Sequence, residues 1–326
     1  MGKTAFVTGG NGFVGLNLVS ALTAAGWQVR ALHRGQNQVQ ELQALGAETV
    51  QGDITDLRTL RQLMPQAPDV VFHAAGNTSM WPRRAAEQTN TNVRGTRNVA
   101  KLALENGAGR LIHISSVMAY GLNTGTVTED TPSRGASTQL NYARSKALAE
   151  REVRKAMRKG LNAVIINPGH MIGPYDQGNW SRLFKLVQQH RLPGMPPGGG
   201  TFCHAGEVSK ALIAAAEKGV NGRNYMLGCV NTSYAGLVNE IAAVMGRDTR
   251  FRALNPSLLN AYARVEELIA PLFGREPEIT RDAIRMLSVN IYCKSKRAEE
   301  ELGYQPHTLR TMLSDCYGWL RDTGRI

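Results

Sequence analysis

Residues 5–15 read Ala5-Phe6-Val7-Thr8-Gly9-Gly10-Asn11-Gly12-Phe13-Val14-Gly15. The apolar start predicts a buried strand, and the pattern after the glycines predicts a helix that ends near Gly26. In this setting Gly9 allows a tight turn, Gly12 lets the backbone approach phosphate, and Gly15 permits close packing of helix on strand. The amides that begin the helix, including those of Phe13 and Val14, favour an anion. A glycine-rich turn without a ligand is the alternative, but we predict dinucleotide binding.

Further along, short apolar runs alternate with helical patterns through the first half of the chain. Such alternation predicts a parallel sheet covered by helices on both faces, because each parallel crossover needs a helix-length connection. We therefore predict an α/β fold with a doubly wound (Rossmann) domain over residues 1–168. The predicted strands are residues 5–8, 28–32, 48–51, 69–73, 110–114 and 163–167.

The second half of the chain, residues 169–326, has a different pattern. Residues 192–201 contain many glycines and prolines and predict a loop. Beyond this loop, helical patterns follow with little strand between them, at 207–218, 233–246, 257–273, 280–288 and 308–321. We predict a smaller, mostly helical substrate lobe, with some segments returning to the first sheet. The segment 258–273 is apolar on one helical side and fits a lid, a dimer surface or ordinary core.

The composition of the 326 residues sets broad limits on function. The four cysteines lie far apart, which predicts neither a disulfide framework nor a bound metal. No room for a signal peptide precedes the first strand, and no apolar run approaches the roughly 20 residues that cross a bilayer. We therefore expect a cytoplasmic protein without a membrane span. The formal net charge is +12, and five basic residues share one predicted helical face, which we interpret as solvated surface. They are Arg151, Arg154, Lys155, Arg158 and Lys159.

The end of the second strand distinguishes between the two nicotinamide dinucleotides. NAD-binding folds commonly place an acidic residue there to hold the ribose 2′-hydroxyl, but this chain has His33-Arg34. A guanidinium binds a 2′-phosphate through paired, charge-assisted hydrogen bonds. We therefore predict that NADP(H) is preferred and that NAD(H) is the second choice. If Arg34 is only a solvated loop residue, this preference does not follow.

Two other strand ends carry candidate cofactor contacts. Asp53 follows the third strand, where it can accept a hydrogen bond from the adenine amine while Ile54 packs on the ring. The alternative is that Asp53 caps the next helix. After the fourth strand, the small residues Ala74 and Ala75 let a flat cofactor pass close to the backbone, although they also suit simple packing.

Tyr142 and Lys146 carry the strongest catalytic signal. Their four-residue spacing places them on one face of a predicted helix. A phenol has a pKa near 10, and a nearby ammonium would lower it toward neutrality, so that Tyr142 can act as an acid. Ser116 follows the fifth strand, where its hydroxyl can orient a substrate oxygen. Taken alone, Ser116 also fits a serine that stabilises a turn. Tyr142 and Lys146 alone also fit an exposed pair on a helix.

Taken together, the glycine loop, Asp53, His73-Ala74-Ala75-Gly76, Ser116 and Tyr142-x-x-x-Lys146 resemble the extended short-chain dehydrogenases/reductases, also called the NAD-dependent epimerase/dehydratase family. The likeness spans nearly the whole chain. Within this family, the segments Val29–Arg34 and Met80-Trp81 look most like the dihydroflavonol-reductase-like branch. Further matching segments are Asn92-Val93-x-Gly95-Thr96, Asn167-Pro168-Gly169 and Glu301-Leu302-Gly303-Tyr304.

The resemblance implies an activity and roles for several residues. That branch mostly reduces ketones or aldehydes with NADPH through a Ser-Tyr-Lys mechanism. Lys146 would hold the nicotinamide ribose, and backbone groups from Pro168 to Met171 would hold the carboxamide. Asn92 resembles the family's helix-distorting asparagine. His204 and Glu207 depart from the commoner His-Val-x-Asp-Val pattern, and their roles stay open.

Two other functions remain as alternatives. A nucleotide-sugar epimerase would use the same residues with retained NAD, and Arg34 argues against it. A non-catalytic regulator or nucleic-acid-binding protein has only the positive charge in its favour, and a basic stripe without interleaved aromatics is a poor platform for single strands. We therefore expect a small-molecule carbonyl or alcohol as the partner and no nucleic acid. A homodimer stays open.

Overall fold

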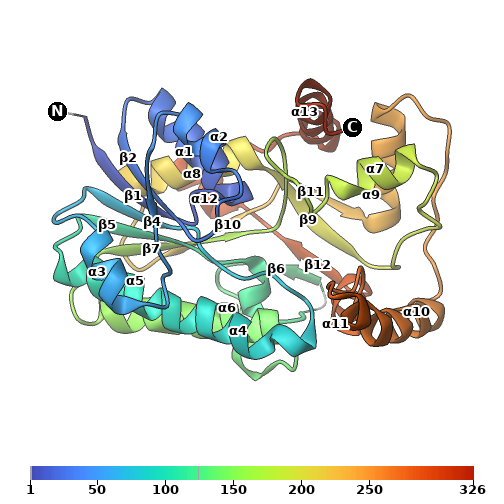
Figure 1. Ribbon diagram of the computed structural model, residues 1–326, viewed down its shortest axis with the longest axis horizontal. Coiled ribbons are helices and arrows are strands. Elements are labelled where there is room, and N and C mark those ends of the chain that lie inside the picture. Colours follow the sequence, from blue (N-terminus) through green and yellow to red (C-terminus); the bar gives the residue numbers. More distant parts are fainter. Residues whose placement is uncertain (1, 124) are drawn as a thin grey trace.

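A seven-stranded parallel sheet forms the centre of the computed structural model, which describes residues 2–123 and 125–326 (Figure 1). The strand order is β10-β7-β5-β4-β1-β2-β3, so the chain changes direction beside β1, where open α/β sheets bind ligands. All six predicted strands are present to within about a residue. The bounds are β1 (Thr4–Thr8), β2 (Gln28–His33), β3 (Glu48–Gln51), β4 (Val70–His73), β5 (Arg110–Ile114), β7 (Ala163–Pro168) and β10 (Asn224–Leu227).

Helices cover both faces of this sheet. One face is covered by α1 (Phe13–Ala24), α2 (Val39–Ala44), α8 (Ala205–Lys218) and α12 (Lys296–Leu302), the other by α3 (Leu57–Leu63), α5 (Thr96–Glu105) and α6 (Asn141–Met157) (Figure 1). Each layer has its own apolar core. Leu16 and Leu212 pack on the first face, and Val99 and Val153 on the second, all fully buried. The predicted doubly wound architecture is confirmed.

The second lobe contains a small sheet as well as helices. Its strand order is β11-β9-β12-β6, with β8 paired to β9. The helices match the predicted positions closely. The strands are β6 (Gly125–Val127), β8 (His170–Ile172), β9 (Gly199–His204), β11 (Val230–Ser233) and β12 (Asn290–Cys293); the helices are α7 (Arg182–Gln188), α9 (Tyr234–Val244), α10 (Pro256–Ile269), α11 (Arg281–Leu287) and α13 (Leu309–Asp322). The short helix α4 (Ala85–Thr89) instead packs against α6.

The predicted loop at residues 192–201 is wrong at its end, because β9 begins at Gly199. The glycines there serve close packing. A side chain at Gly200 would overlap the His170 ring, so this strand needs glycine at that position. Glycine normally indicates a loop, which is why the sequence pattern predicted one here. The chain also exchanges strands between the sheets, since β6 joins the small sheet and β10 the large one. We propose that residue 168 divides the main segments of the two lobes.

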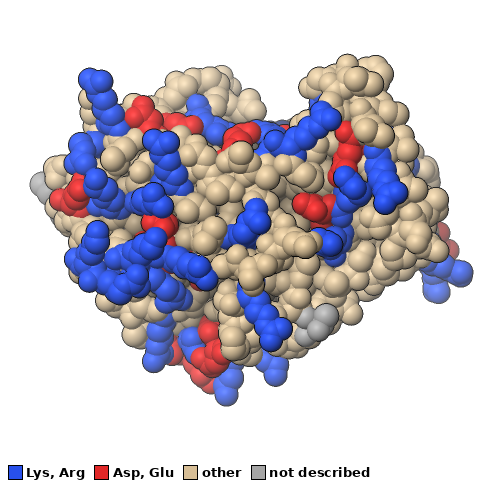
Figure 2. Space-filling model, turned by 90° about the horizontal axis from the view of Figure 1, so that it is seen from below, with Lys and Arg blue, Asp and Glu red and all other residues tan. Residues whose placement is uncertain are grey.

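The predicted basic helix face lies on α6 and is partly paired. Glu152 accepts hydrogen bonds from Lys155 at 2.6 Å and from Arg97 of α5 at 2.8 Å. Arg151, Arg158 and their neighbours extend from the surface, and Figure 2 shows Lys and Arg gathered on this side of the molecule. Among the described residues, no helix combines the length and the apolar character needed to cross a bilayer.

Candidate active site

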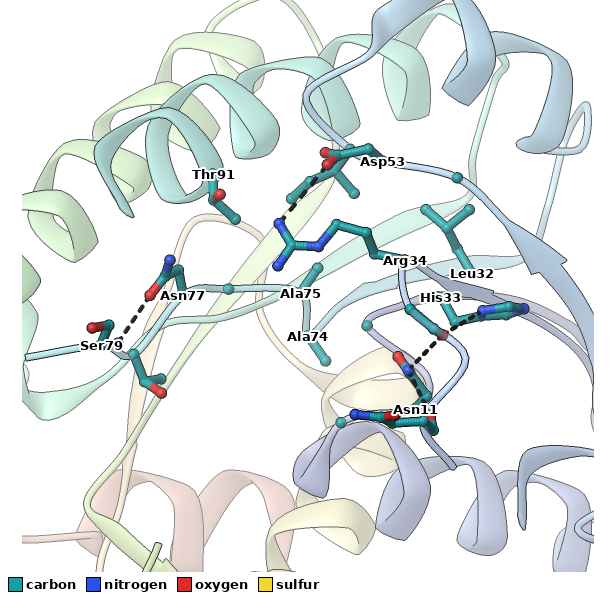
Figure 3. A pocket seen from close by; sticks show the side chains of 18 of the residues that line it. Asn11, Leu32, His33, Arg34, Asp53, Ala74, Ala75, Asn77, Ser79 and Thr91 are labelled. Atoms are coloured by element: carbon teal, nitrogen blue, oxygen red, sulfur yellow. Dashed lines mark hydrogen bonds and ion pairs between the residues drawn. The ribbon is translucent and has the colours of Figure 1, made fainter. Parts of the chain in front are cut away.

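The first of two adjoining cavities lies at the carboxyl ends of β1, β2 and β4 and has a volume of about 560 Å³ (Figure 3). It brings together half of the predicted cofactor residues. These are Gly9, Gly12, Arg34, Asp53, Ile54, Ala74 and Ala75. Phe13 and Met171 instead line the second cavity, and Pro168 is buried at the end of β7.

The glycine loop has the backbone shape that a dinucleotide pyrophosphate requires. Gly9 has a φ of 70°, and a Cβ there would lie 2.7 Å from the Ala75 backbone. A Cβ on Gly15 would overlap the carbonyl oxygen of Gly9, so the helix packs directly on the loop. Gly12 begins α1 without a side-chain cap, which leaves the first amides of the helix available to an anion. The residues present therefore fit a dinucleotide.

Arg34 and Asp53 face each other within this cavity, at the ends of β2 and β3 (Figure 3). The guanidinium Nη1 lies 3.9 Å from Asp53 Oδ2, and the Arg34 side chain is 60% exposed, so it is free to bind a ligand. Asp53 Oδ1 accepts hydrogen bonds from the Thr55 amide and hydroxyl at 2.7 and 2.8 Å. It stabilises the turn before α3, but the cap of that helix is Asp56.

Arg84 is a second guanidinium on this cavity, and no sequence pattern pointed to it. It lies on the segment after β4 and pairs with Glu87 at 2.7 Å and with Glu276 of the second lobe. Glu276 also lines the cavity. The second lobe therefore contributes to the rim of the dinucleotide site through an ion pair between residues distant in sequence.

Ser116 and Tyr142 line the second cavity, which has a volume of about 430 Å³. Ser116 follows β5, and its hydroxyl accepts a hydrogen bond from the Met118 amide at 3.1 Å. Tyr142 lies in the first turn of α6. Lys146 lies one turn further along and is buried, and its ammonium donates to the carbonyl oxygen of Ile114 at 3.1 Å. Ser116 and Tyr142 thus share one cavity, which adjoins the first cavity at Thr78, and Lys146 is bound to the end of β5 just before Ser116.

Burial controls the protonation of the two titratable groups. It raises the pKa of the Tyr142 phenol, and a hydrogen bond with Ser116 lowers that pKa by a smaller amount. The predicted lowering of the Tyr142 pKa by Lys146 does not appear in this structure, because desolvation outweighs other effects on the phenol. Burial also lowers the pKa of Lys146 to about 8, and the Glu150 carboxylate partly opposes this shift. Tyr142 is therefore a protonated acid at neutral pH.

Glu150 is a buried residue that the sequence interpretation missed. Its Oε1 accepts hydrogen bonds from Ser115 Oγ at 2.6 Å and from Asn167 Nδ2 at 2.7 Å. Asn167 Nδ2 also donates to the Ser116 carbonyl oxygen at 2.9 Å. Glu150 thus joins α6 to the ends of β5 and β7 and fixes the backbone of Ser116. The sequence feature that could have revealed Glu150 is its position four residues after Lys146, which repeats the spacing between Tyr142 and Lys146.

Asn92 distorts its helix, as the resemblance implied. It lies in a π-helical turn, Asn90–Gly95, and its side chain bonds both backbone groups of Asn77, at 2.7 and 3.0 Å. It also donates to Ser145 Oγ at 2.9 Å. Asn92 therefore holds the loop after β4 against the helix that carries Tyr142.

His204 and Glu207, whose roles the sequence left open, lie in a small cluster with His307. His204 lies beside Asp315 at 3.3 Å, while Glu207 pairs with Lys210 at 2.7 Å and His307 at 3.2 Å. One nitrogen of each imidazole and one Glu207 oxygen lie within 4.8 Å of one another. Glu207 therefore joins α8 to His307, just before α13, whereas burial lowers the pKa of His204 and leaves both of its ring nitrogens without a hydrogen-bond partner among the described residues.

The pKa of Lys146 predicts a pH dependence of cofactor binding. The ammonium form donates charge-assisted hydrogen bonds, and it is lost as the pH rises through about 8. We expect the dissociation constant of NADPH to rise roughly tenfold between about pH 7 and pH 9. Titration calorimetry across this range measures it. Lys146→Arg stays charged and should give a flat profile, and Glu150→Gln should move the midpoint downward. If the dissociation constant of Lys146→Arg rises with pH as that of the wild type does, the assignment to Lys146 is contradicted.

Comparisons with known proteins agree with this architecture. The model of the NAD dependent epimerase/dehydratase family matches residues 5–228. A putative dihydroflavonol 4-reductase of Synechocystis sp. is 30% identical, over 98% of this chain and 95% of that protein. Sterol demethylase protein B of Methylococcus capsulatus is 29% identical, over 99% of this chain and 100% of its own. The crystal structure of gox2253 superposes with a TM-score of 0.85 at 31% identity, covering 99% of both chains. This chain belongs to the NAD dependent epimerase/dehydratase family of NAD(P)-dependent oxidoreductases.

Proposed function

We propose that this protein reduces a ketone or aldehyde with apolar substituents, using NADP(H). One observation carries the proposal: Ser116 and Tyr142 lie on a largely apolar cavity that adjoins the dinucleotide pocket. Beyond these two hydroxyls, the cavity wall is mainly aliphatic and aromatic. Its apolar members include Met80, Met118, Trp180, Leu183, Leu186, Leu192, Met195, Ile279 and Met286.

The chain's own residues supply the acid and the orientation for this reaction. When bound, the reduced nicotinamide supplies a hydride to the carbonyl carbon. The Tyr142 phenol donates its proton to the carbonyl oxygen, which gives the alcohol, and Ser116 holds that oxygen by a hydrogen bond. Lys146 holds the cofactor ribose, and the hydrogen bond from Ser116, which favours the ionised phenol, stabilises the phenolate that remains. A proton from solvent restores Tyr142.

The preference for NADP(H) rests on Arg34. Its guanidinium is exposed at the adenosine end of the cavity and is held only loosely by Asp53 at 3.9 Å. A 2′-phosphate there would gain charge-assisted hydrogen bonds from Arg34. Arg84 lines the same cavity but is already bound to two carboxylates. Arg34 is therefore the residue on which we base the choice of cofactor.

The apolar wall favours a carbonyl reductase over the alternative of a nucleotide-sugar epimerase. A nucleoside diphosphate requires several cationic or polar partners. Among the described residues that line this cavity, the cation is Arg182, whose guanidinium already donates to the Glu278 carbonyl oxygen at 3.3 and 3.4 Å. His170 also lines the cavity, and burial lowers its pKa to about 4, so it is neutral at physiological pH. The sterol relative's name agrees with an apolar substrate.

A graded series of ketones tests the proposal. Each added methylene that enters an apolar site contributes about 0.8 kcal/mol, or roughly a fourfold rise in kcat/KM. We expect kcat/KM for NADPH-dependent reduction of linear 3-oxo esters to rise by about this factor per methylene until the cavity is full. Met118→Asp, which places a charge in the wall, should remove the dependence on chain length. A series that reacts equally at all lengths, or a nucleotide sugar converted without added NADPH, would contradict the proposal.

A further inference from the structure

One side of α10, continued by the short helix Ala270–Phe273, is apolar and exposed to solvent. We define the α10 face by its seven residues. They are Leu258, Tyr262, Val265, Leu268, Ile269, Leu272 and Phe273, each between 40% and 82% exposed. In the rest of the described chain, Val220 is the only comparably exposed large apolar side chain. Contiguous apolar patches of this kind mark interaction sites.

The exposed apolar residues of α10 lie on one side of the helix, and its buried residues lie on another. Leu259, Ala263 and Glu266 lie on a neighbouring side of the helix and are buried, with Leu259 and Ala263 packed against Ile284 of α11. The exposed residues recur at helical spacing over nearly four turns. α10 therefore has one apolar side within the protein and a second one directed away from it. Figure 1 shows α10 at the edge of the second lobe, with α11 as its neighbour.

The α10 face lies next to the substrate cavity. Leu259, on the inner side of α10, lines that cavity together with Ala283 and Met286 of α11. One helix thus separates an apolar cavity from an apolar outer surface. A ligand that leaves a lipid phase at the α10 face would pass this helix to enter the cavity that Tyr142 also lines.

Cationic side chains border the α10 face. Arg191 and Arg275 lie near Tyr262 on one side. Arg264, Arg281 and Arg285 line a hollow beside α10 on the other side. Guanidinium groups beside an exposed apolar helix are the arrangement of interfacial helices that bind anionic lipid.

The acidic groups nearby are largely neutralised. Glu266 and Glu267 have side chains only 11% exposed and pair with Arg275 and Arg281 at 2.9 and 2.8 Å. These two pairs cancel in charge, so the excess positive charge along the α10 face comes from Arg191, Arg264 and Arg285. Glu276 pairs with Arg84. Glu278 and Asp282 are the remaining acidic groups, and Asp282 is partly buried. The whole chain has a formal net charge of +12, which also favours an anionic surface.

We propose that the α10 face docks this protein on the surface of an anionic bilayer, with the apolar side chains among the upper acyl chains and the arginines at the phosphate groups. A second copy of the chain fits less well. A two-fold contact would bring the bordering arginines of both copies together, and each copy carries the same positive charge. The substrate would then enter from the lipid phase. That last step alone rests on the proposed function.

Sedimentation with vesicles tests the docking without any substrate. The full chain is mixed with vesicles of phosphatidylglycerol and phosphatidylcholine, or of phosphatidylcholine alone. We expect binding to the anionic vesicles that weakens on addition of salt, and weaker binding to the neutral ones. The variant Leu268→Ser/Leu272→Ser/Phe273→Ser should reduce the partition constant on the order of a hundredfold. The control Val220→Ser, at an exposed apolar residue elsewhere, should bind as the wild type does.

The melting temperature and NADPH affinity of the triple variant should equal those of the wild type, because its three side chains contact neither cavity. If it fails to fold, Leu272→Ser alone, at the most exposed position, should still weaken binding severalfold. Absent wild-type binding, or binding that these changes leave intact, would overturn the proposal. So would a wild-type dimer that the triple variant dissociates while neither protein binds vesicles. A protein that binds vesicles but reduces no carbonyl would contradict only the proposed function.

Discussion

Tyr142→Phe is expected to lower turnover on the order of a thousandfold while leaving the NADPH dissociation constant nearly unchanged. The phenol is the proton donor of the proposed reaction, and a positioned general acid contributes about 10² to 10⁴ to the rate. Burial keeps the phenol protonated, so the wild-type acid is fully present at neutral pH. Steady-state turnover and calorimetric binding separate the two effects.

Tyr120→Phe is the matched control for this change. Tyr120 is also buried, and burial raises its pKa, but its hydroxyl faces the Glu129 carbonyl oxygen at 3.4 Å and lines neither cavity. Turnover of Tyr120→Phe should stay within about threefold of wild type, because only one long hydrogen bond is lost. Near-normal turnover of Tyr142→Phe would remove the phenol from the mechanism. Equal losses in both variants would indicate a general effect on packing.

Arg34→Asp has the second large expected effect. It replaces a cation that would bind the 2′-phosphate with an anion that repels it, so the KM for NADPH should rise at least about a hundredfold. The KM for NADH, which lacks this phosphate, should change by no more than about threefold. The ratio of kcat/KM for the two cofactors measures the result.

Arg58→Asp makes the same change of charge outside the dinucleotide cavity. Arg58 is exposed in the first turn of α3, where an acidic residue is well tolerated. This control should leave the cofactor ratio near the wild-type value. If Arg34→Asp also leaves the ratio of kcat/KM for NADPH and NADH unchanged, another group selects the cofactor.

The sequence predicted the large sheet well because local patterns encode it. Buried parallel strands are short apolar runs, and six of the seven occur where the pattern placed them, while β10 was not predicted as a strand. Gly9 and Gly15 were recognisable because no side chain fits at either position. Tyr142 and Lys146 were recognisable by their spacing on one helix. These features depend on neighbours in the sequence.

The features that the sequence did not reveal depend on contacts between distant segments. β9 uses Gly199 and Gly200 because other side chains fill the space beside them. Arg84 reaches the cofactor cavity through its ion pair with Glu276, almost two hundred residues away. The pKa of Tyr142 follows from burial that only the folded chain creates. The apolar side of segment 258–273 was visible, but which side would meet solvent was not.

Transfer of deuterium from the cofactor tests the central proposal most directly. NADPH carrying deuterium on the transferred position of C4 is incubated with the protein and the best ketone of the graded series. We expect one deuterium on the carbinol carbon of the alcohol for each NADPH oxidised, with Tyr142→Phe forming this product far more slowly. A product without deuterium, or substrate conversion without net NADPH oxidation, would contradict the assignment of this site to carbonyl reduction.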